Sequence, residues 1–173
     1  MRLFVAIQFD SEVKDRIQTV QERLRCLDNC ANFTRRENLH LTLAFLGETP
    51  EARLRDIEGA MRAVETVPLE LCFDRTGRFR QRDSELWWIG VRKNRELERM
   101  QAELTARLRL AGFSLEERTF HPHLTLAREV RLTRQPDQAA LLGGPFAARA
   151  DSMSLMRSQR LRSRLIYTEI FRR

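Results

Sequence analysis

The tetrapeptide His-Leu-Thr-Leu occurs twice in this sequence, beginning at His40 and at His123. Residues two positions apart on a β-strand point to the same side, so each histidine would share a face with the hydroxyl of Thr42 or Thr125. Histidine is the one side chain whose unperturbed pKa lets it gain and lose a proton near neutral pH. Two histidines on one surface could therefore act as a general acid and a general base.

This set of side chains suits in-line displacement at phosphorus. One histidine would take a proton from water while the other gives a proton to the departing sugar oxygen on the opposite side. The hydroxyls of Thr42 and Thr125 could donate hydrogen bonds to the non-bridging oxygens, where negative charge resides. The three cysteines and three histidines make no convincing zinc site. We therefore expect chemistry that needs no metal and no other cofactor.

A single histidine of this kind would more often cap a strand or satisfy a hydrogen bond in the core. The matched placement of two of the three histidines, each with a threonine two residues later, favours the functional interpretation. The third, His121, precedes Pro122, which disturbs a strand, so we expect His121 to shape a turn.

The two motifs belong to a longer internal repeat with an offset of 83 residues. The same offset relates a strand predicted near Leu3 to one near Leu86, and a helix capped by Asp10 or Ser11 to one capped by Asn94. Agreement of strand, helix and motif under one shift is hard to obtain by chance. The repeat predicts a duplicated strand–helix–strand unit in which the two histidine strands are equivalent.

Other elements follow from periodicity and capping. Thr49 as the N-cap and Pro50 as the first residue predict the start of another helix. Two basic segments, Arg75–Arg82 and Arg157–Ser163, are expected to be hairpin turns, either solvated or in contact with the phosphate backbone of a bound partner. The first predicted helix has an apolar stripe of five residues. These are Val13, Ile17, Val20, Leu24 and Leu27.

Composition limits the classes of protein to consider. A chain of 173 residues with 42% hydrophobic residues can form one compact unit. The net charge of +7 favours a polyanionic partner over a neutral metabolite. No run approaches the roughly 18 apolar residues of a membrane span, and the odd number of cysteines indicates a reducing compartment. We expect a soluble, cytoplasmic monomer without a membrane partner.

Four stretches of the sequence resemble the two-histidine (2H) phosphoesterases, and among them the bacterial and archaeal RNA 2′,3′-cyclic phosphodiesterases once named 2′-5′ RNA ligases. The motif is specific, and neither copy departs from the pattern His-hydrophobic-Thr-hydrophobic. Together the stretches span nearly the whole chain. They are Arg2–Phe9, Asn38–Gly47, Glu85–Val91 and Phe120–Arg128.

The resemblance implies a bilobal α+β fold, in which the duplicated units form two antiparallel sheets around a central cleft with helices on the outside. We expect a single two-lobed 2H phosphoesterase domain over residues 1–173. Its repeat halves would cover roughly 1–80 and 84–130, and a C-terminal hairpin would cover 146–172.

The resemblance also implies the reaction: opening of an RNA-terminal 2′,3′-cyclic phosphate to leave a 2′-phosphate. His40 would be the proton donor to the 3′ oxygen, and His123 the acceptor that activates water. Thr42 and Thr125 would bind the phosphate. The partner is then RNA, or an oligonucleotide, that ends in a 2′,3′-cyclic phosphate.

The repeat diverges five positions after each histidine, to Phe45 in one copy and Arg128 in the other. An aromatic ring and a guanidinium plane could hold a nucleotide base between them, and the resemblance supports both as nucleotide contacts. Strict alternation places both residues on the face opposite the histidine, so this prediction requires a bulge or a strand end.

Some features and alternatives remain open at this point. Adjacent Trp87 and Trp88 point oppositely on a strand, so at least one must be core, and core is the default for both. Tyr167 is a weaker candidate for the active site. The same acid–base pair could also join a cyclic phosphate to a 5′-hydroxyl as a 2′-5′ bond. A basic RNA-binding module with vestigial histidines is the third possibility.

Overall fold

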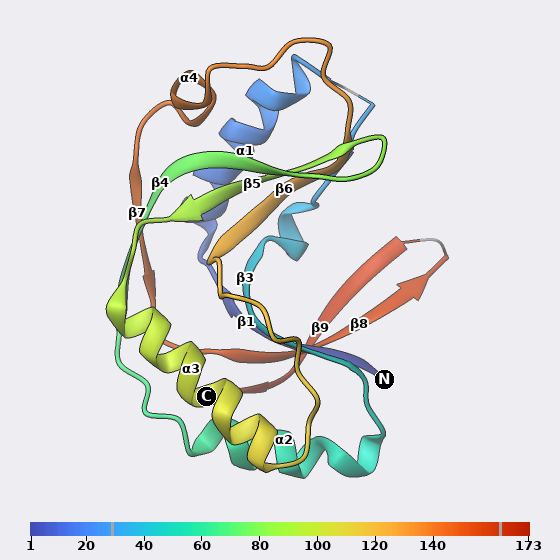
Figure 1. Cartoon of the computed structure of the whole chain (residues 1–173), viewed down its shortest axis with the longest axis vertical. Helices are drawn as coiled ribbons and strands as arrows, with labels where there is room; N and C mark the ends of the chain where they lie inside the picture. The colour runs from blue at the N-terminus through green and yellow to red at the C-terminus, as the bar shows by residue number, and fades with distance from the viewer. Residues whose placement is uncertain (29, 163) are drawn as a thin grey trace.

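The computed structural model describes residues 1–28, 30–162 and 164–173 (Figure 1). The α-helices of this part of the chain are α1 (Ser11–Arg25), α2 (Leu54–Arg62), α3 (Arg95–Leu110) and α4 (Gln138–Leu142), and short 3₁₀ turns cover Arg36–Asn38 and Glu51–Arg53. Its strands are β1 (Arg2–Gln8), β2 (Asn32–Phe33), β3 (His40–Glu48), β4 (Leu69–Arg80), β5 (Glu85–Val91), β6 (His123–Val130), β7 (Phe146–Ala150), β8 (Ser154–Leu161) and β9 (Arg164–Arg172).

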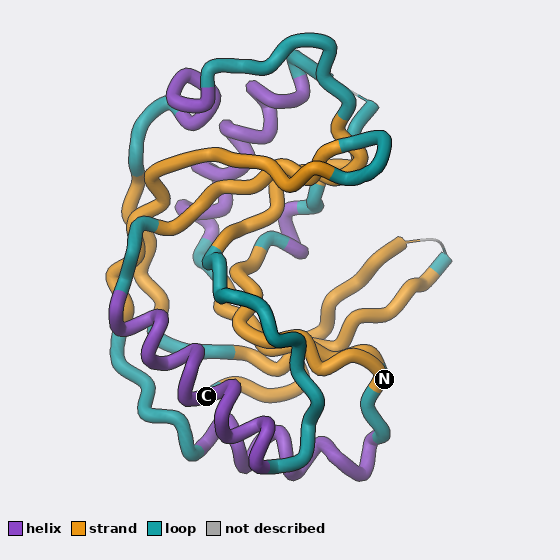
Figure 2. Tube along the Cα trace, in the orientation of Figure 1, coloured by secondary structure: helices purple, strands orange, loops and turns teal. Residues whose placement is uncertain are grey.

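All strand pairs are antiparallel, and they follow the order β7-β4-β5-β6-β3-β1-β8-β9, with β2 on β6. The halves β7-β4-β5-β6 and β3-β1-β8-β9 meet at a single residue pair, Leu41 with Leu124. Figure 2 shows the two halves as two lobes of one curled sheet with helices on the outer side. The predicted α+β fold of duplicated units is confirmed, and its two sheets join along a narrow seam.

The repeat predicted from the sequence is present as structure. β1 and β5 differ by the offset of 83 residues at both ends, and β3 and β6 share it at their first residues. Each unit pairs its first strand antiparallel with its last. The helices are exchanged between the halves, because α1 contacts β6 while α3 contacts β3. Figure 1 shows α1 and α4 on one lobe and α2 and α3 on the other.

The predicted helix starts are confirmed at Asp10 and Asn94, whose side chains accept hydrogen bonds from the backbone N–H groups of Val13 and Leu97. The apolar stripe of α1 is buried except at Leu27, which lies beyond the end of the helix and is 51% exposed. Helices and sheet share one large apolar core that spans both lobes.

The helix start predicted at Thr49 and Pro50 is wrong. A 3₁₀ turn over Glu51–Arg53 follows Pro50, and α2 begins only at Leu54. Thr49 is buried, and its Oγ1 donates to the carbonyl of Gly47 at 3.4 Å instead of capping the helix. Its backbone N–H donates to Met1 O at 2.8 Å. Contacts with Gly47 and Met1 thus fix Thr49 in place of the helix cap that the local sequence predicts.

The expected turn at Arg75–Arg82 is largely a strand. β4 continues to Arg80, and the turn lies at its end, where Gln81 N donates to Ser84 O at 2.8 Å. Gly77, within this segment, is a strand residue that pairs with Trp88, whose indole ring occupies the space a Cβ would need. A glycine in a strand can serve such a close approach.

The predicted hairpin over residues 146–172 is shorter than expected. Phe146–Ala150 pairs with β4 in the other half of the sheet, because Asp151–Met153 carry the chain from β4 to β1. The hairpin consists of β8 and β9 alone. Most of the basic segment expected as its turn belongs to β8, and Ser163 lies outside the described residues.

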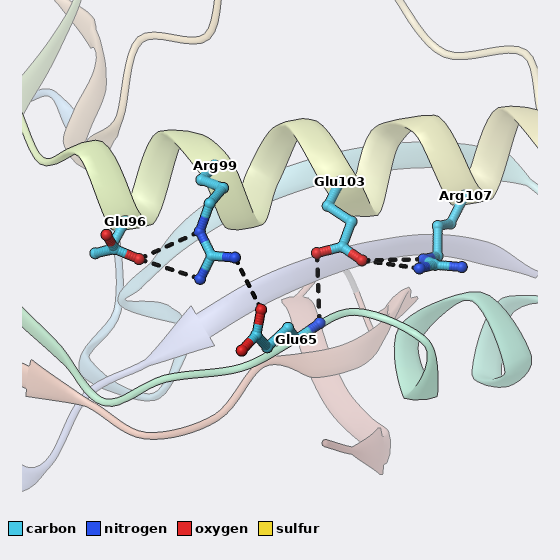
Figure 3. Close-up of polar contacts among 5 residues, drawn as sticks. All are labelled: Glu65, Glu96, Arg99, Glu103 and Arg107. Atoms are coloured by element: carbon cyan, nitrogen blue, oxygen red, sulfur yellow. Dashed lines mark hydrogen bonds and ion pairs between the residues drawn. The ribbon is translucent and has the colours of Figure 1, made fainter.

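A network of charged side chains ties α3 to the segment that follows α2 (Figure 3). Arg99 contacts Glu65 at 3.0 Å and Glu96 at 3.1 Å, while Glu103 accepts from the Glu65 N–H and pairs with Arg107. Hydrogen bonding lowers the pKa of Glu103 and raises that of Arg99. Exposed ion pairs contribute little each, so the network mainly orients the helix.

No helix in the described part of the chain is both long enough and apolar enough to cross a membrane.

Candidate active site

The two histidine motifs lie side by side at the seam between the two halves. Leu41 pairs with Leu124, so the residues before and after each of them point to the opposite face of the sheet. His40, Thr42, His123 and Thr125 therefore share one face, which we call the histidine face. Continuing the register would bring each histidine beside the threonine of the other motif, which combines the two copies into one site.

Both histidines are held in the same way. Nδ1 of His40 lies 2.7 Å from the carbonyl oxygen of Asn38, and Nδ1 of His123 lies 2.6 Å from that of His121. A carbonyl only accepts hydrogen bonds, so Nδ1 carries the proton in both rings and Nε2 is the reactive nitrogen. Nε2 of His40 lies 3.1 Å from Thr42 Oγ1. The backbone of His121 thus orients His123, while its exposed side chain makes no such contact.

Equivalent β-bulges change the alternation just after each motif. Ala6 pairs with Thr42 and Val5 with Ala44, so Leu43 is an extra residue on β3. Leu126 is the corresponding extra residue on β6, because Trp88 pairs with Thr125 and Trp87 with Ala127. A bulge shifts the side chains that follow it to the other face of the sheet. The positions five residues after the histidines are thereby brought to the histidine face.

Phe45 and Arg128 occupy these positions. The Phe45 ring is 6.2 Å from that of Phe4, which itself lies 4.9 Å from His40, and the Phe45 side chain is 61% exposed. The charge of Arg128 acts on both His40 and His123. The bulge that the sequence argument required is therefore present, and both side chains are available beside the histidines.

The carbonyl of each bulged residue accepts a hydrogen bond from a side-chain amide on the exchanged helix, and that of Leu126 also accepts from Thr34 N–H at 2.9 Å. Gln101 on α3 donates to Leu43 O at 3.2 Å, and Gln21 on α1 donates to Leu126 O at 2.8 Å. Gln21 is 4% exposed and also donates to Thr34 O at 2.8 Å. These contacts lie at the same place in the repeat, although the two glutamines are not at equivalent positions in the sequence.

Aromatic rings surround both imidazoles. Phe4 and Tyr167 lie 4.9 and 5.2 Å from the ring of His40, and Phe79 and Trp88 lie 5.2 and 6.1 Å from that of His123. Tyr167, a weak candidate in the sequence, is thus placed against His40.

Phe79 and Trp88 are neighbours of His123 that were not predicted from the sequence. Trp87 is core as expected, but Trp88 is only partly buried and lies flat over Gly77 and Gly90, where a Cβ would overlap its ring. Gly77 on β4 pairs with Trp88, and Gly90 follows Trp88 by two residues on β5. These two glycines are the sequence signal that could have indicated the position of the indole ring.

These surroundings lower the pKa of both histidines. Burial is the main cause for His40, whose pKa falls to about 4, with smaller contributions from the charges of Arg128 and His123. Burial also lowers the pKa of His123, followed by the charge of Arg128. The backbone hydrogen bond at Nδ1 opposes the shift in each case. Both histidines are therefore neutral at pH 7 in the free protein.

A search of the described residues finds no group of three or more His, Cys, Asp or Glu side chains that could hold a metal ion. The site instead offers two imidazole nitrogens, two hydroxyls and one guanidinium on one face.

Comparison with known proteins supports the same family. The model of the 2′-5′ RNA ligase superfamily matches residues 9–162. The RNA 2′,3′-cyclic phosphodiesterase of Methanothermobacter thermautotrophicus is 32% identical over 185 residues, covering 99% of this chain and 98% of its own. The corresponding protein of Archaeoglobus fulgidus is 32% identical and covers 82% of this chain and 79% of its own.

Solved structures agree with the sequence relatives. Escherichia coli LigT in complex with 3′-AMP superposes with a TM-score of 0.83 at 25% identity, covering 99% of this chain and 95% of that chain. The expectation of an enzyme is also confirmed. Relatives named RNA 2′,3′-cyclic phosphodiesterase match this chain over most of its length and most of their own. The chain therefore belongs to the 2′-5′ RNA ligase superfamily, the two-histidine phosphoesterases that the paired motif indicated.

Proposed function

We propose that this protein hydrolyses the 2′,3′-cyclic phosphate at an RNA end to a 2′-phosphate, without a metal ion. The observation that carries the proposal is the matched pair of imidazoles on one sheet face, each with its Nδ1 proton on a backbone carbonyl. Both Nε2 atoms then face the substrate side and can exchange protons with a phosphodiester bound between them, once Thr42 Oγ1 turns from Nε2 of His40 to the phosphate. The name RNA 2′,3′-cyclic phosphodiesterase, carried by the relatives, agrees with this chemistry.

In the proposed reaction, a water oxygen forms a bond to phosphorus while the bond from phosphorus to the 3′ oxygen breaks. Nε2 of His123 accepts the proton from water. Nε2 of His40 donates a proton to the departing 3′ oxygen, and the phosphate remains on the 2′ oxygen. Afterwards His123 carries a proton that His40 has lost, so one proton exchange with solvent restores the starting state.

The difference in burial between the two rings supports His40 as the donor. The hydrogen bond at its Nδ1 is partly buried, whereas that of His123 is exposed to solvent, from which water must come. The pKa of about 4 leaves His40 without an Nε2 proton at pH 7 in the free protein, so the donor must be protonated when substrate binds. A bound phosphodiester anion favours the protonated imidazole, so substrate itself promotes the loading of this proton.

The remaining predicted residues take supporting roles. Thr42 and Thr125 lie beside the histidines and can donate hydrogen bonds to the non-bridging oxygens. Phe45 and Arg128 can hold the terminal base between a ring and a guanidinium plane.

The test is hydrolysis of an oligonucleotide ending in a 2′,3′-cyclic phosphate, in EDTA, with 2′- and 3′-phosphate products resolved. Replacing His40 or His123 by Gln should lower kcat by about 10²–10⁴-fold. The His121→Gln variant is the matched control, because it keeps the backbone carbonyl that holds His123, and its exposed side chain acts on His123 only through its charge. Full activity of either catalytic variant, or loss of wild-type activity in EDTA, would overturn the proposal, provided that thermal melting shows each variant folded.

The superfamily's name favours one second candidate, 2′-5′ ligation. A 5′-hydroxyl would replace water on the His123 side, and the same proton transfers would form a 2′-5′ bond. Incubating RNA halves that carry a cyclic phosphate and a 5′-hydroxyl distinguishes the two, since only ligation yields a longer product. Salt-sensitive RNA binding with neither product would indicate a non-catalytic module. A cytoplasmic location and a monomeric state remain predictions.

A further inference from the structure

The β8–β9 hairpin extends beyond the rest of the sheet. β1 pairs with β8 only from Ser154 to Ser158, so the strand pair past Ser158 has no neighbouring strand. Figure 1 shows this end of the hairpin projecting from the body of the molecule. We call the described residues 159–162 and 164–166 the arm. A two-stranded ribbon is only marginally stable by itself. A projecting ribbon that is also strongly charged therefore indicates a binding role for this segment.

The charge of the arm is entirely positive. The sequence between Asp151 and Glu169 contains four arginines and no acidic residue. Three of these arginines, Arg160, Arg162 and Arg164, are exposed. None of the three takes part in an ion pair or side-chain hydrogen bond within the described structure. The arm therefore offers forked donors that no carboxylate of the described structure neutralises.

The arm continues the histidine face. Tyr167 contacts His40 and pairs with Ser158, which also pairs with Arg2. The charges of Arg2 and Arg128 both act on Tyr167, so these cations lie near the ring. Arg160 follows Ser158 by two residues and therefore points to the same face of the sheet. A row of cationic and hydroxyl side chains thus leads from the active site to the arm.

We propose that the arm and Arg2 bind the phosphodiester backbone of the RNA nucleotides on the 5′ side of the cyclic phosphate. The inference rests on the proposed function, because it assumes that the cyclic end lies between the histidines. Arginine donors match phosphate oxygens and do not read base edges, so the arm increases affinity for RNA without selecting its sequence. The enzyme then prefers RNA ends over mononucleotides.

The test compares two substrates, a mononucleotide 2′,3′-cyclic phosphate and a ten-nucleotide RNA with the same end. In the wild type, kcat/KM should be higher for the longer RNA, and the difference should shrink as salt rises. The triple variant Arg160→Gln, Arg162→Gln, Arg164→Gln should lower the ratio of the two kcat/KM values by about tenfold or more. Each lost phosphate contact should also reduce the salt slope for the longer RNA by about 0.7.

A matched control removes three positive charges from the outer helices, by changing Arg55, Arg95 and Arg109 to Gln. These residues are exposed on α2 and α3 and should leave the substrate ratio unchanged. An unchanged ratio and salt slope in the arm variant would overturn the inference, as would an equal loss in the control.

Failure of the proposed function is distinguishable, because the wild type would then hydrolyse neither substrate. Fluorescence anisotropy with a labelled ten-nucleotide RNA ending in a phosphate tests the arm in that case as well. The arm variant should bind more weakly than the control variant by about tenfold, and equal binding by the two would overturn the inference.

Discussion

The side-chain amide of Gln101 donates a hydrogen bond to the carbonyl of Leu43, the bulged residue of β3, at 3.2 Å. The bulge brings Phe45 to the face that carries His40. A helix from the second repeat therefore supports the active-site geometry of the first. Gln21 supports Leu126 in the same way from the first repeat.

The variants Gln21→Glu and Gln101→Glu keep the side-chain shape but remove the amide donor. We expect each to lower the free energy of unfolding by about 1–3 kcal/mol, because backbone carbonyls lose a donor and face a carboxylate that can only accept. The larger effect should occur at Gln21, which donates to two carbonyls. Urea unfolding at pH 7.5 measures this, and equal stability of wild type and Gln21→Glu would contradict the stated role.

The pH dependence of the reaction should be a bell, since His40 must be protonated and His123 neutral. Burial lowers both pKa values in the free enzyme, that of His40 to about 4, so the maximum of kcat/KM should lie below pH 6.5. The bell for kcat should lie at higher pH, because bound phosphate anion raises both pKa values. A monotonic profile between pH 4 and 9 would exclude paired roles.

Arg128 links the two histidines electrostatically. Its charge lowers the pKa of both, so Arg128→Gln should move the kcat/KM bell to higher pH, whereas Arg128→Lys should leave it near its wild-type position. Both variants lose the guanidinium plane and should lower kcat/KM on RNA by about tenfold through weaker base stacking. If both variants had the wild-type pH profile, Arg128 would not act on the histidines through its charge.

Gly77 should be required for the placement of Trp88. A Cβ at this position would overlap the indole, so Gly77→Ala must move a ring that lies beside His123. We expect a loss of about 1–3 kcal/mol in stability together with reduced kcat. Gly59 on α2 is the matched control, because a Cβ there contacts nothing, and Gly59→Ala should be neutral or slightly stabilising. Unchanged stability and activity in Gly77→Ala would contradict this account.

Much of the fold could be predicted from local signals. Asp10 and Asn94 are confirmed as caps because an N-cap acts through its own side chain and the next few N–H groups. The repeat offset also predicted that the two histidine strands are equivalent. This prediction needed only the order of residues along each strand, which does not depend on distant parts of the chain. Thr49 shows the limit of such signals, since its Oγ1 donates to Gly47 O and a 3₁₀ turn separates it from the start of α2.

The sequence by itself determined the reactive groups: two imidazoles, each with a hydroxyl two residues away, in equivalent strands. Only the tertiary structure decided which other side chains join them. The bulges at Leu43 and Leu126 depend on pairing with β1 and β5, and glutamines from distant helices satisfy their carbonyls. Side-chain alternation is a property of one strand, whereas a bulge is a property of a strand pair, so the face of Phe45 and Arg128 could not be read from either motif alone.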